Sequence, residues 1–259
     1  MDFASSFKMA TRKHDLRGVT VEFEDNVAVL RMEDGENRFN VETIKRLHDA
    51  LDVVEANTKA KALITIGTGK FYSNGLDLDT LMKSTPTYLT QFGEGWRTIM
   101  LRMLTFPMPT VAALNGHCYA GGAVFALMHD FRVMRRDRGW FCLNEVHINL
   151  RFNPFTREIT RLKLDGKTLV ECVMQGRRYT GNEAKQEGIV HELADSGDLL
   201  KTAKERALRY TPPAGFNRDT LKDIKEGFYE SAFVDFEGLD MESSMSRAVN
   251  LKTASTSKL

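Results

Sequence analysis

Cysteine is scarce in this chain and long apolar runs are missing, which excludes two classes of protein. The 259 residues include three cysteines, Cys118, Cys142 and Cys172, and none of them belongs to a CxxC pair. An odd number without such a pair argues against a disulfide framework and favours a reducing compartment. The first 18 residues mix charges with isolated phenylalanines, so they resemble neither a signal peptide nor a membrane span. We expect a soluble protein without a membrane span.

An excess of charge of one sign is also lacking. The 36 basic residues are balanced by 35 acidic ones, for a formal net charge of +1. No overall field therefore attracts the chain to nucleic acid or to an anionic membrane, and a phosphate-bearing ligand would need a local basic patch. The six histidines are scattered, with no second His, Cys or carboxylate at the spacing of a metal site. We expect no metal ion.

The hydrophobic content of 42% is sufficient for one large core. Residues 19–23 and 27–32 alternate apolar with polar side chains around a short turn, which predicts a hairpin with one buried face. Apolar residues then recur at helical spacing from Val41 to Val54, and residues 62–66 read as a buried strand. The alternation continues with a helix around 96–104, strands at 110–114 and 131–134, a helix whose first turn holds Pro154, and a helix-to-strand step at 188–190. This pattern predicts an α/β core with parallel strands.

The pattern becomes wholly helical past residue 197. Two helix faces are apolar, and they consist of Leu200, Ala203 and Ala207 and of Leu221, Ile224 and Phe228. We therefore divide the chain into a core, residues 1–197, and a C-terminal helical region, residues 198–259. Within the core, residues 1–18 are expected to be flexible.

Three segments contain residues suited to chemistry, and the first is Phe71 to Leu78. Gly75 lies there among the small polar residues Ser73, Asn74 and Asp77, directly after a buried strand. Such a loop can turn backbone N–H groups outward. It can equally be an ordinary turn in which Asp77 caps the next helix.

The second segment, residues 115–124, links a buried strand to an apolar helix. Gly121 and Gly122 would let a ligand approach the start of this helix, where N–H groups lack partners and the macrodipole favours negative charge. Close packing of the helix against a strand explains the glycine pair equally well.

The third segment, residues 141–148, is a mainly apolar run that Asn144 and Glu145 interrupt. Because an unpaired buried charge is costly, Glu145 is either exposed at a strand end or held in an apolar site with a raised pKa. The second arrangement is what a general base requires.

In this order the three segments resemble the crotonase superfamily of enoyl-CoA hydratases and isomerases, over residues 19–190. Residues 71–78 are similar to the family's first oxyanion loop, 112–126 to its second, and 180–190 to a later helix-to-strand signature. The resemblance implies a spiral core of ββα units with C-terminal helices, and a homotrimer or a dimer of trimers. It also implies an acyl-CoA substrate and no separate cofactor, since coenzyme A is part of that substrate.

The resemblance also implies roles for individual residues. The backbone N–H groups of Leu76 and Gly121 would hold the thioester oxygen, and such donors contribute about 2.7 to 4 kcal/mol each. Glu145 would carry the proton. Substrate contacts are implied for Ser73, Asn74, Gly75, Leu76, Asp77, Gly121 and Asn144.

Val124 decides between the reactions of the family. Its hydratases use two carboxylates, and the first of them lies three residues after the helix glycine, where this chain has Val124. Valine can neither orient water nor accept its proton. Moving a double bond needs only one base, which removes a proton from C2 and returns it to C4. The pattern therefore resembles the Δ3,Δ2-enoyl-CoA isomerases, with Glu145 acting through a dienolate.

Some features allow two interpretations. After Glu145, residues 149–151 replace the family's usual glycine and proline-containing stretch, which leaves the shape of the acyl pocket open. A second feature is a basic run that consists of Arg132, Arg135, Arg136 and Arg138. These side chains either bind the phosphates of CoA or carry charge into solvent at a strand end. One apolar set either lines an acyl tunnel or belongs to the core, and it consists of Trp96, Met100, Met103 and Leu104.

The last three residues, Ser257, Lys258 and Leu259, form the tripeptide that the peroxisomal import receptor reads at a free C-terminus. The alternative is an accidental polar tail. Combined with the resemblance, the tripeptide predicts a peroxisomal matrix isomerase that converts 3-enoyl-CoA to 2-enoyl-CoA in β-oxidation of unsaturated fatty acids. The competing hypotheses are an enoyl-CoA hydratase or acyl-CoA hydrolase of the same superfamily, and a non-catalytic acyl-CoA-binding subunit.

Overall fold

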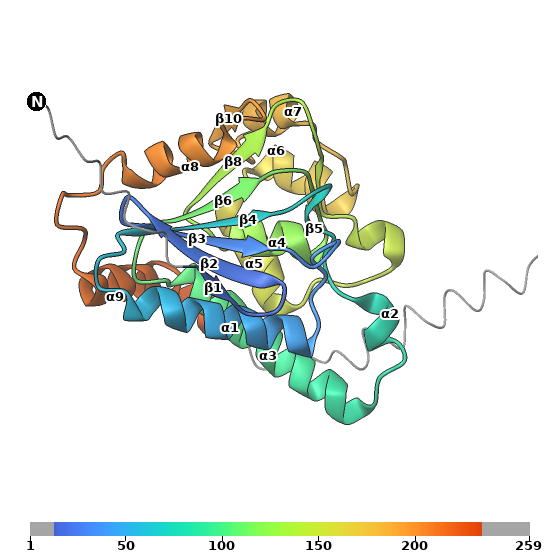
Figure 1. The fold of residues 1–259 in the computed structure, drawn as a ribbon. Helices are drawn as coiled ribbons and strands as arrows, with labels where there is room; N and C mark the ends of the chain where they lie inside the picture. The colour runs from blue at the N-terminus through green and yellow to red at the C-terminus, as the bar shows by residue number, and fades with distance from the viewer. Residues whose placement is uncertain (1–12, 235–259) are drawn as a thin grey trace, which may run out of the picture.

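The structure contains two β-sheets, and the strands of the larger one cross the middle of the molecule (Figure 1). The computed structural model describes residues 13–234. The large sheet has seven strands in the order β1-β2-β3-β4-β6-β8-β10. Their bounds are β1 (His14–Asp15), β2 (Val19–Glu24), β3 (Val27–Met32), β4 (Ala62–Gly67), β6 (Thr110–Leu114), β8 (Phe131–Arg135) and β10 (Glu192–Ala194). The small sheet consists of β5 (Phe71–Ser73), β7 (His117–Tyr119) and β9 (Phe141–Cys142).

The predicted hairpin is confirmed at the edge of the large sheet. β2 and β3 pair antiparallel with Val19 opposite Met32, and Asp25 and Asn26 both have positive φ in the turn between them. Positive φ at both central residues gives a turn whose twist matches that of the strands. At the same edge, residues 14 and 15 form β1, which pairs antiparallel with β2.

The rest of the large sheet is parallel from β3 through β4, β6 and β8 to β10, as the sequence pattern predicts. The last strand begins at Glu192, slightly later than the expected step at 188–190. Gly188 has a positive φ of 70° after helix α7 (Gly181–Gln186), and the two residues that follow it are buried in the connection.

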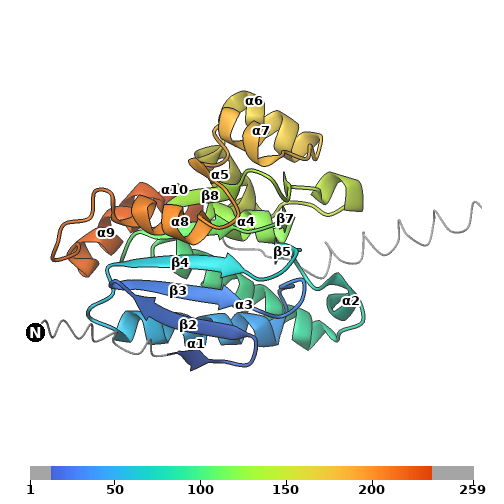
Figure 2. The same ribbon diagram turned by 45° about the horizontal axis from the view of Figure 1, so that its top comes forward.

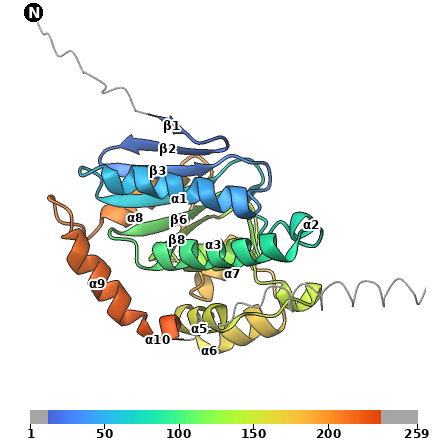
Figure 3. The same ribbon diagram turned by 90° about the horizontal axis from the view of Figure 1, so that it is seen from below.

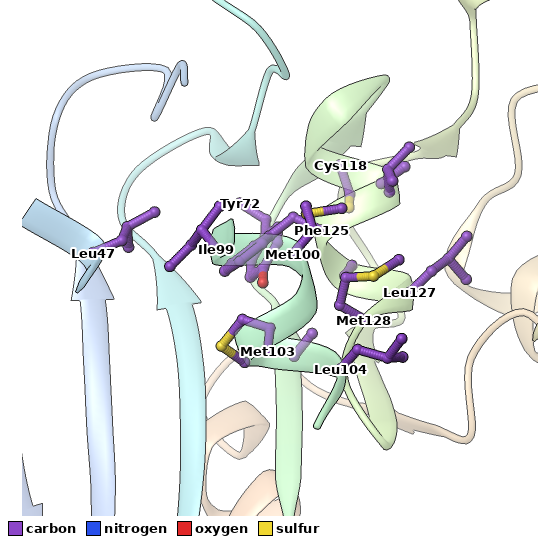
Figure 4. Packing of buried hydrophobic residues seen from close by; sticks show 14 of the residues in the cluster. Leu47, Tyr72, Ile99, Met100, Met103, Leu104, Cys118, Phe125, Leu127 and Met128 are labelled. Atoms are coloured by element: carbon purple, nitrogen blue, oxygen red, sulfur yellow. The ribbon is translucent and has the colours of Figure 1, made fainter. Parts of the chain in front are cut away.

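Helices cover both faces of the large sheet, and side chains of its strands alternate between them (Figure 3). On one face α1 (Val41–Ala56) and α3 (Pro86–Leu104) pack over Ala28 and Leu30. On the other face α8 (Leu199–Leu208) packs over Val27 and Val29. Figure 4 shows Met100, Met103 and Leu104 of α3 among the buried residues of the first face, and Trp96 is buried there too. These four residues therefore belong to the core.

The remaining helices include α4 (Gly121–Leu127), all of whose residues are buried. They are α2 (Leu78–Leu81), α4, α5 (Pro154–Lys163), α6 (Gly166–Leu169), α9 (Arg218–Phe228) and α10 (Glu230–Val234), with a 3₁₀ helix η1 (Glu145–Ile148) and a π-helix η2 (Val170–Met174). In Figure 2, α6 and α7 lie beyond α4 and α5, on the side away from α1. Among residues 13–234, no helix is both long and apolar enough to cross a membrane.

The helices after residue 197 differ in how they are held. α8 contributes Ala203 and Ala207 to the core of the large sheet, so it packs as part of the same unit as the strands. α9 is fixed by polar contacts, because the Lys225 ammonium donates to the carbonyls of Phe106 and Met108 and to Asp130, at 3.0, 3.1 and 2.7 Å. Its apolar side chains Ile224 and Phe228 are 61% and 75% exposed.

Candidate active site

The three candidate segments meet because each follows one strand of the small sheet. β5, β7 and β9 are parallel and adjacent in that order. The loop with Gly75 follows β5, Ala120 and Gly121 follow β7, and Leu143 to Glu145 follow β9. Carboxyl ends of parallel strands lie at one edge of a sheet, so the topology brings together segments separated by about seventy residues.

The first two loops touch through their glycines. A Cβ atom placed on Gly75, which has a φ of +82°, would lie 2.9 Å from the backbone nitrogen of Gly121. A Cβ atom placed on Gly121 would lie 3.4 Å from the backbone nitrogen of Leu76 and 2.9 Å from its Cδ2. A side chain at either glycine would push the loops apart, and the close approach places the two amide groups on adjoining stretches of backbone.

These two amides are free of protein acceptors. Within residues 13–234, neither the Leu76 N–H nor the Gly121 N–H donates a hydrogen bond. Their neighbours are occupied, since the Asp77 N–H donates to the Phe39 carbonyl and the Ala120 N–H to the Cys142 carbonyl, both at 2.9 Å. Two unpaired donors at one place can bind an oxygen that carries negative charge.

Glu145 is buried, which is one of the two arrangements that the sequence allows, the other being exposure at a strand end. It is 7% exposed at the first position of η1, and its Oε2 atom has no hydrogen-bond partner in the described part of the chain. Burial raises the pKa of its carboxyl from an ordinary 4.5 to about 7, and a hydrogen bond from its own backbone partly opposes this rise. A carboxyl with a pKa near 7 can accept and return a proton at neutral pH.

Backbone hydrogen bonds connect Glu145 with the second loop. Tyr119 pairs with Cys142, and the Ala120 N–H donates to the carbonyl of Cys142, three residues before Glu145. On the other side, the Leu150 N–H donates to the Glu145 carbonyl at 3.0 Å, and Asn149 ends η1 in a left-handed conformation. The position of the carboxylate is thus tied to the loop that presents Gly121.

The polar side chains of the first loop are engaged within the protein. The Ser73 hydroxyl donates to the Asn37 carbonyl at 2.7 Å, and the Asn74 amide donates to Glu36 at 2.9 Å. Asp77 caps α2 by accepting from the Thr80 N–H at 3.2 Å. These hydrogen bonds hold the shape of the loop.

The side chains of Asn144 and Val124 form none of the hydrogen bonds that engage the polar side chains of the first loop. The Asn144 Oδ1 atom is buried and has no partner among the described residues, which leaves it available to a ligand. Val124 is 3% exposed and packs in the core that contains Phe125. An apolar side chain therefore occupies the position where the resemblance implies the first acid of a hydratase. Within residues 13–234 no cluster of His, Cys, Asp or Glu could hold a metal ion.

Two asparagines that support the site are not singled out by sequence reasoning. The Asn115 Oδ1 accepts from the Gly67 N–H at 2.9 Å, and its amide donates to the Phe71 carbonyl at 3.3 Å. The Asn37 amide donates to the Tyr72 carbonyl at 3.1 Å. Both fix β5 and hence the first loop. Their sequence signal is weak, because asparagine is common in ordinary turns.

In the basic run from Arg132 to Arg138, one residue does not carry its charge into solvent. Arg132 is 2% exposed, and its guanidinium donates to the carbonyls of Ile189 and His129 at 2.6 and 3.3 Å. Arg135 and Arg136 form ion pairs with Asp137 and Asp195 near the surface. Arg132 therefore joins β8 to the connection that follows α7.

Known proteins resemble this chain in sequence over most of its length. The profile of the enoyl-CoA hydratase/isomerase family matches residues 22–235. The chain belongs to this family. It is 33% identical over 204 residues to the peroxisomal enoyl-CoA delta isomerase 2 of Arabidopsis thaliana, covering 76% of this chain and 85% of that protein. It is 36% identical over 200 residues to enoyl-CoA delta isomerase 3 of the same plant, covering 75% of this chain and 84% of that one.

Solved structures show the fold of the family. The human mitochondrial delta3-delta2-enoyl-CoA isomerase superposes with a TM-score of 0.76 at 20% identity. The match covers 94% of this chain and 100% of the human protein. An enoyl-CoA hydratase from Mycobacterium ulcerans gives the same TM-score at 24% identity, covering 90% of this chain and 98% of the other. The expected crotonase fold is therefore confirmed, and because hydratase and isomerase share it, the fold alone does not separate the two reactions.

Proposed function

We propose that this chain is a Δ3,Δ2-enoyl-CoA isomerase with Glu145 as its single base. The observation that carries the proposal is the buried carboxyl of Glu145, with a pKa of about 7 and an unpartnered Oε2. It lies on the same sheet edge as the unpaired N–H groups of Leu76 and Gly121. The enoyl-CoA delta isomerases of Arabidopsis support the same reaction by their similarity.

The reaction follows from these groups. The Glu145 carboxylate removes a proton from C2 of a 3-enoyl-CoA, and the electrons move toward the thioester to give a dienolate. The Leu76 and Gly121 N–H groups donate to the thioester oxygen, where the negative charge develops. Protonated Glu145 then returns the proton to C4, which leaves a conjugated 2-enoyl-CoA and regenerates the base. Asn144 contacts the acyl-CoA through its unpartnered Oδ1.

Val124 supports isomerisation over hydration. Addition of water needs a group that orients and deprotonates it, and a buried valine in the core provides none. Hydratase or hydrolase activity remains the second candidate because the family includes hydratases.

The test is conversion of a 3-enoyl-CoA to its 2-enoyl isomer, followed by chromatography of the CoA esters. We expect Glu145→Gln to lower kcat by about 10²- to 10⁴-fold, the usual range for loss of a general base. Glu94→Gln, which changes an exposed carboxylate of α3, is the matched control and should retain full activity.

Four results would contradict the proposal. Full activity in Glu145→Gln would exclude its role as base. A 3-hydroxyacyl-CoA product would indicate a hydratase, and free CoA would indicate a hydrolase. Binding of acyl-CoA with no change in any enoyl substrate would indicate the non-catalytic subunit.

We also propose that the enzyme acts in peroxisomal β-oxidation of unsaturated fatty acids, as a homotrimer or dimer of trimers. Ser257, Lys258 and Leu259 lie outside the described residues, so the targeting role depends on the sequence and on the peroxisomal relatives. A fluorescent fusion at the N-terminus should enter peroxisomes, and deletion of the last three residues should leave it in the cytosol. Sedimentation of the purified chain would give the oligomer.

A further inference from the structure

Ala120, between the two candidate loops, has an unusual backbone conformation. Its φ is 47° and its ψ is −124°. Within residues 13–234, six non-glycine residues have positive φ, and four of them are Asn or Asp, whose side chains tolerate that region. Alanine has no such side chain, and its ψ lies outside the left-handed helical region, so the conformation is strained.

Two backbone hydrogen bonds hold Ala120 in this conformation. Its N–H donates to the Cys142 carbonyl at 2.9 Å, and its carbonyl accepts from the Val124 N–H at 3.0 Å. The first bond leads to the segment with Glu145, and the second starts α4. The strained residue is therefore restrained from both sides by elements of the candidate site.

The geometry of Ala120 sets the direction of the Gly121 N–H. The peptide plane that carries this N–H rotates with the ψ angle of Ala120, so a restricted ψ means a fixed donor direction. The methyl group also faces the first loop, because a Cβ atom placed on Gly75 would lie only 3.1 Å from the Ala120 Cβ. Gly75 directly precedes Leu76, which has the other unpaired N–H.

We propose that Ala120 is a positioning residue that fixes the direction of the Gly121 N–H and its separation from the Leu76 N–H. This inference rests on the proposed function to the extent that the two N–H groups bind a thioester oxygen. Glycine at this position would remove both the methyl spacer and the restriction on ψ, while relieving the strain. Stability and catalysis should therefore respond to the substitution in opposite directions.

The experiment compares Ala120→Gly with Ala120→Ser. In Ala120→Gly we expect an unchanged or higher Tm, a KM close to wild type, and a kcat about tenfold lower, because a misdirected donor loses part of an oxyanion contribution. Ala120→Ser keeps the Cβ atom and the restriction on ψ, so its kcat should stay near wild type. Asn26→Gly, at positive φ in the exposed β2–β3 turn, controls for the general effect of glycine.

A spectroscopic measurement separates this inference from the proposed reaction. The carbonyl stretch of a bound, ¹³C-labelled saturated acyl-CoA should move to lower frequency in the wild type, and it should move less in Ala120→Gly. The inference would be overturned if Ala120→Gly had the kcat and the carbonyl shift of the wild type. It would also be overturned if Ala120→Ser lost as much kcat and carbonyl shift as Ala120→Gly. A clear drop in Tm for Ala120→Gly would overturn the strain argument. Absence of isomerase activity in the wild type would refute the proposed function, while the carbonyl shifts would still test Ala120.

Discussion

Replacing Glu145 by glutamine should remove the base and stabilise the fold at the same time. The carboxyl is neutral when buried at low pH, but above its raised pKa it must be ionised in an apolar site. Glutamine has nearly the same shape and no charge. The variant therefore avoids the free energy that wild type loses when Glu145 ionises.

The magnitude and the pH range follow from the shift in the pKa of Glu145, from an ordinary 4.5 to about 7. A group whose pKa is raised by folding contributes full stability below its unfolded pKa and loses it as the pH rises through the folded pKa. At about 1.4 kcal/mol per pH unit, the shift corresponds to about 3 kcal/mol. The advantage of Glu145→Gln should be below about 1 kcal/mol at pH 5 and should reach about 3 kcal/mol above pH 7.

Urea denaturation of both proteins at pH 5 and pH 8 measures this difference directly, with Glu94→Gln as the exposed control. A variant that is less stable than wild type at pH 8 would refute the reasoning. So would a difference of equal size at both pH values, because it would show that ionisation of Glu145 is not its cause.

Three further results are expected. The kcat/KM of the wild type should fall about tenfold per pH unit below pH 7 and level off above it, because Glu145 with a pKa of about 7 must be ionised in the free enzyme; a pH profile that stays flat down to pH 5 would contradict this. Gly121→Ala should lower kcat by about 10²- to 10³-fold through contact with Leu76, and steady-state kinetics would show it. Lys225→Met should lower the free energy of unfolding by about 3 kcal/mol, because Asp130 and two backbone carbonyls lose their hydrogen-bond donor. Urea denaturation measures this loss, and the kcat of the folded enzyme should not change.

Much of the core could be predicted because local patterns decide it. The strands at 62–66, 110–114 and 131–134 are short apolar runs between turns, and the structure places strands at all three. The α1 helix follows the spacing of its buried side chains. Burial of the α8 face against the large sheet was not evident, since an amphipathic helix can pack on several surfaces.

The sequence by itself determined which chemical groups are present: one carboxylate at Glu145, glycines at positions 75 and 121, and an apolar Val124. Only the tertiary structure decided that Glu145 is buried rather than exposed, that Asp77 caps a helix, and that Arg132 is an internal residue. These outcomes depend on segments far apart in the chain that meet at one sheet edge. Desolvation, and with it the pKa of a base, is a property of that assembled surrounding and of no local run of residues.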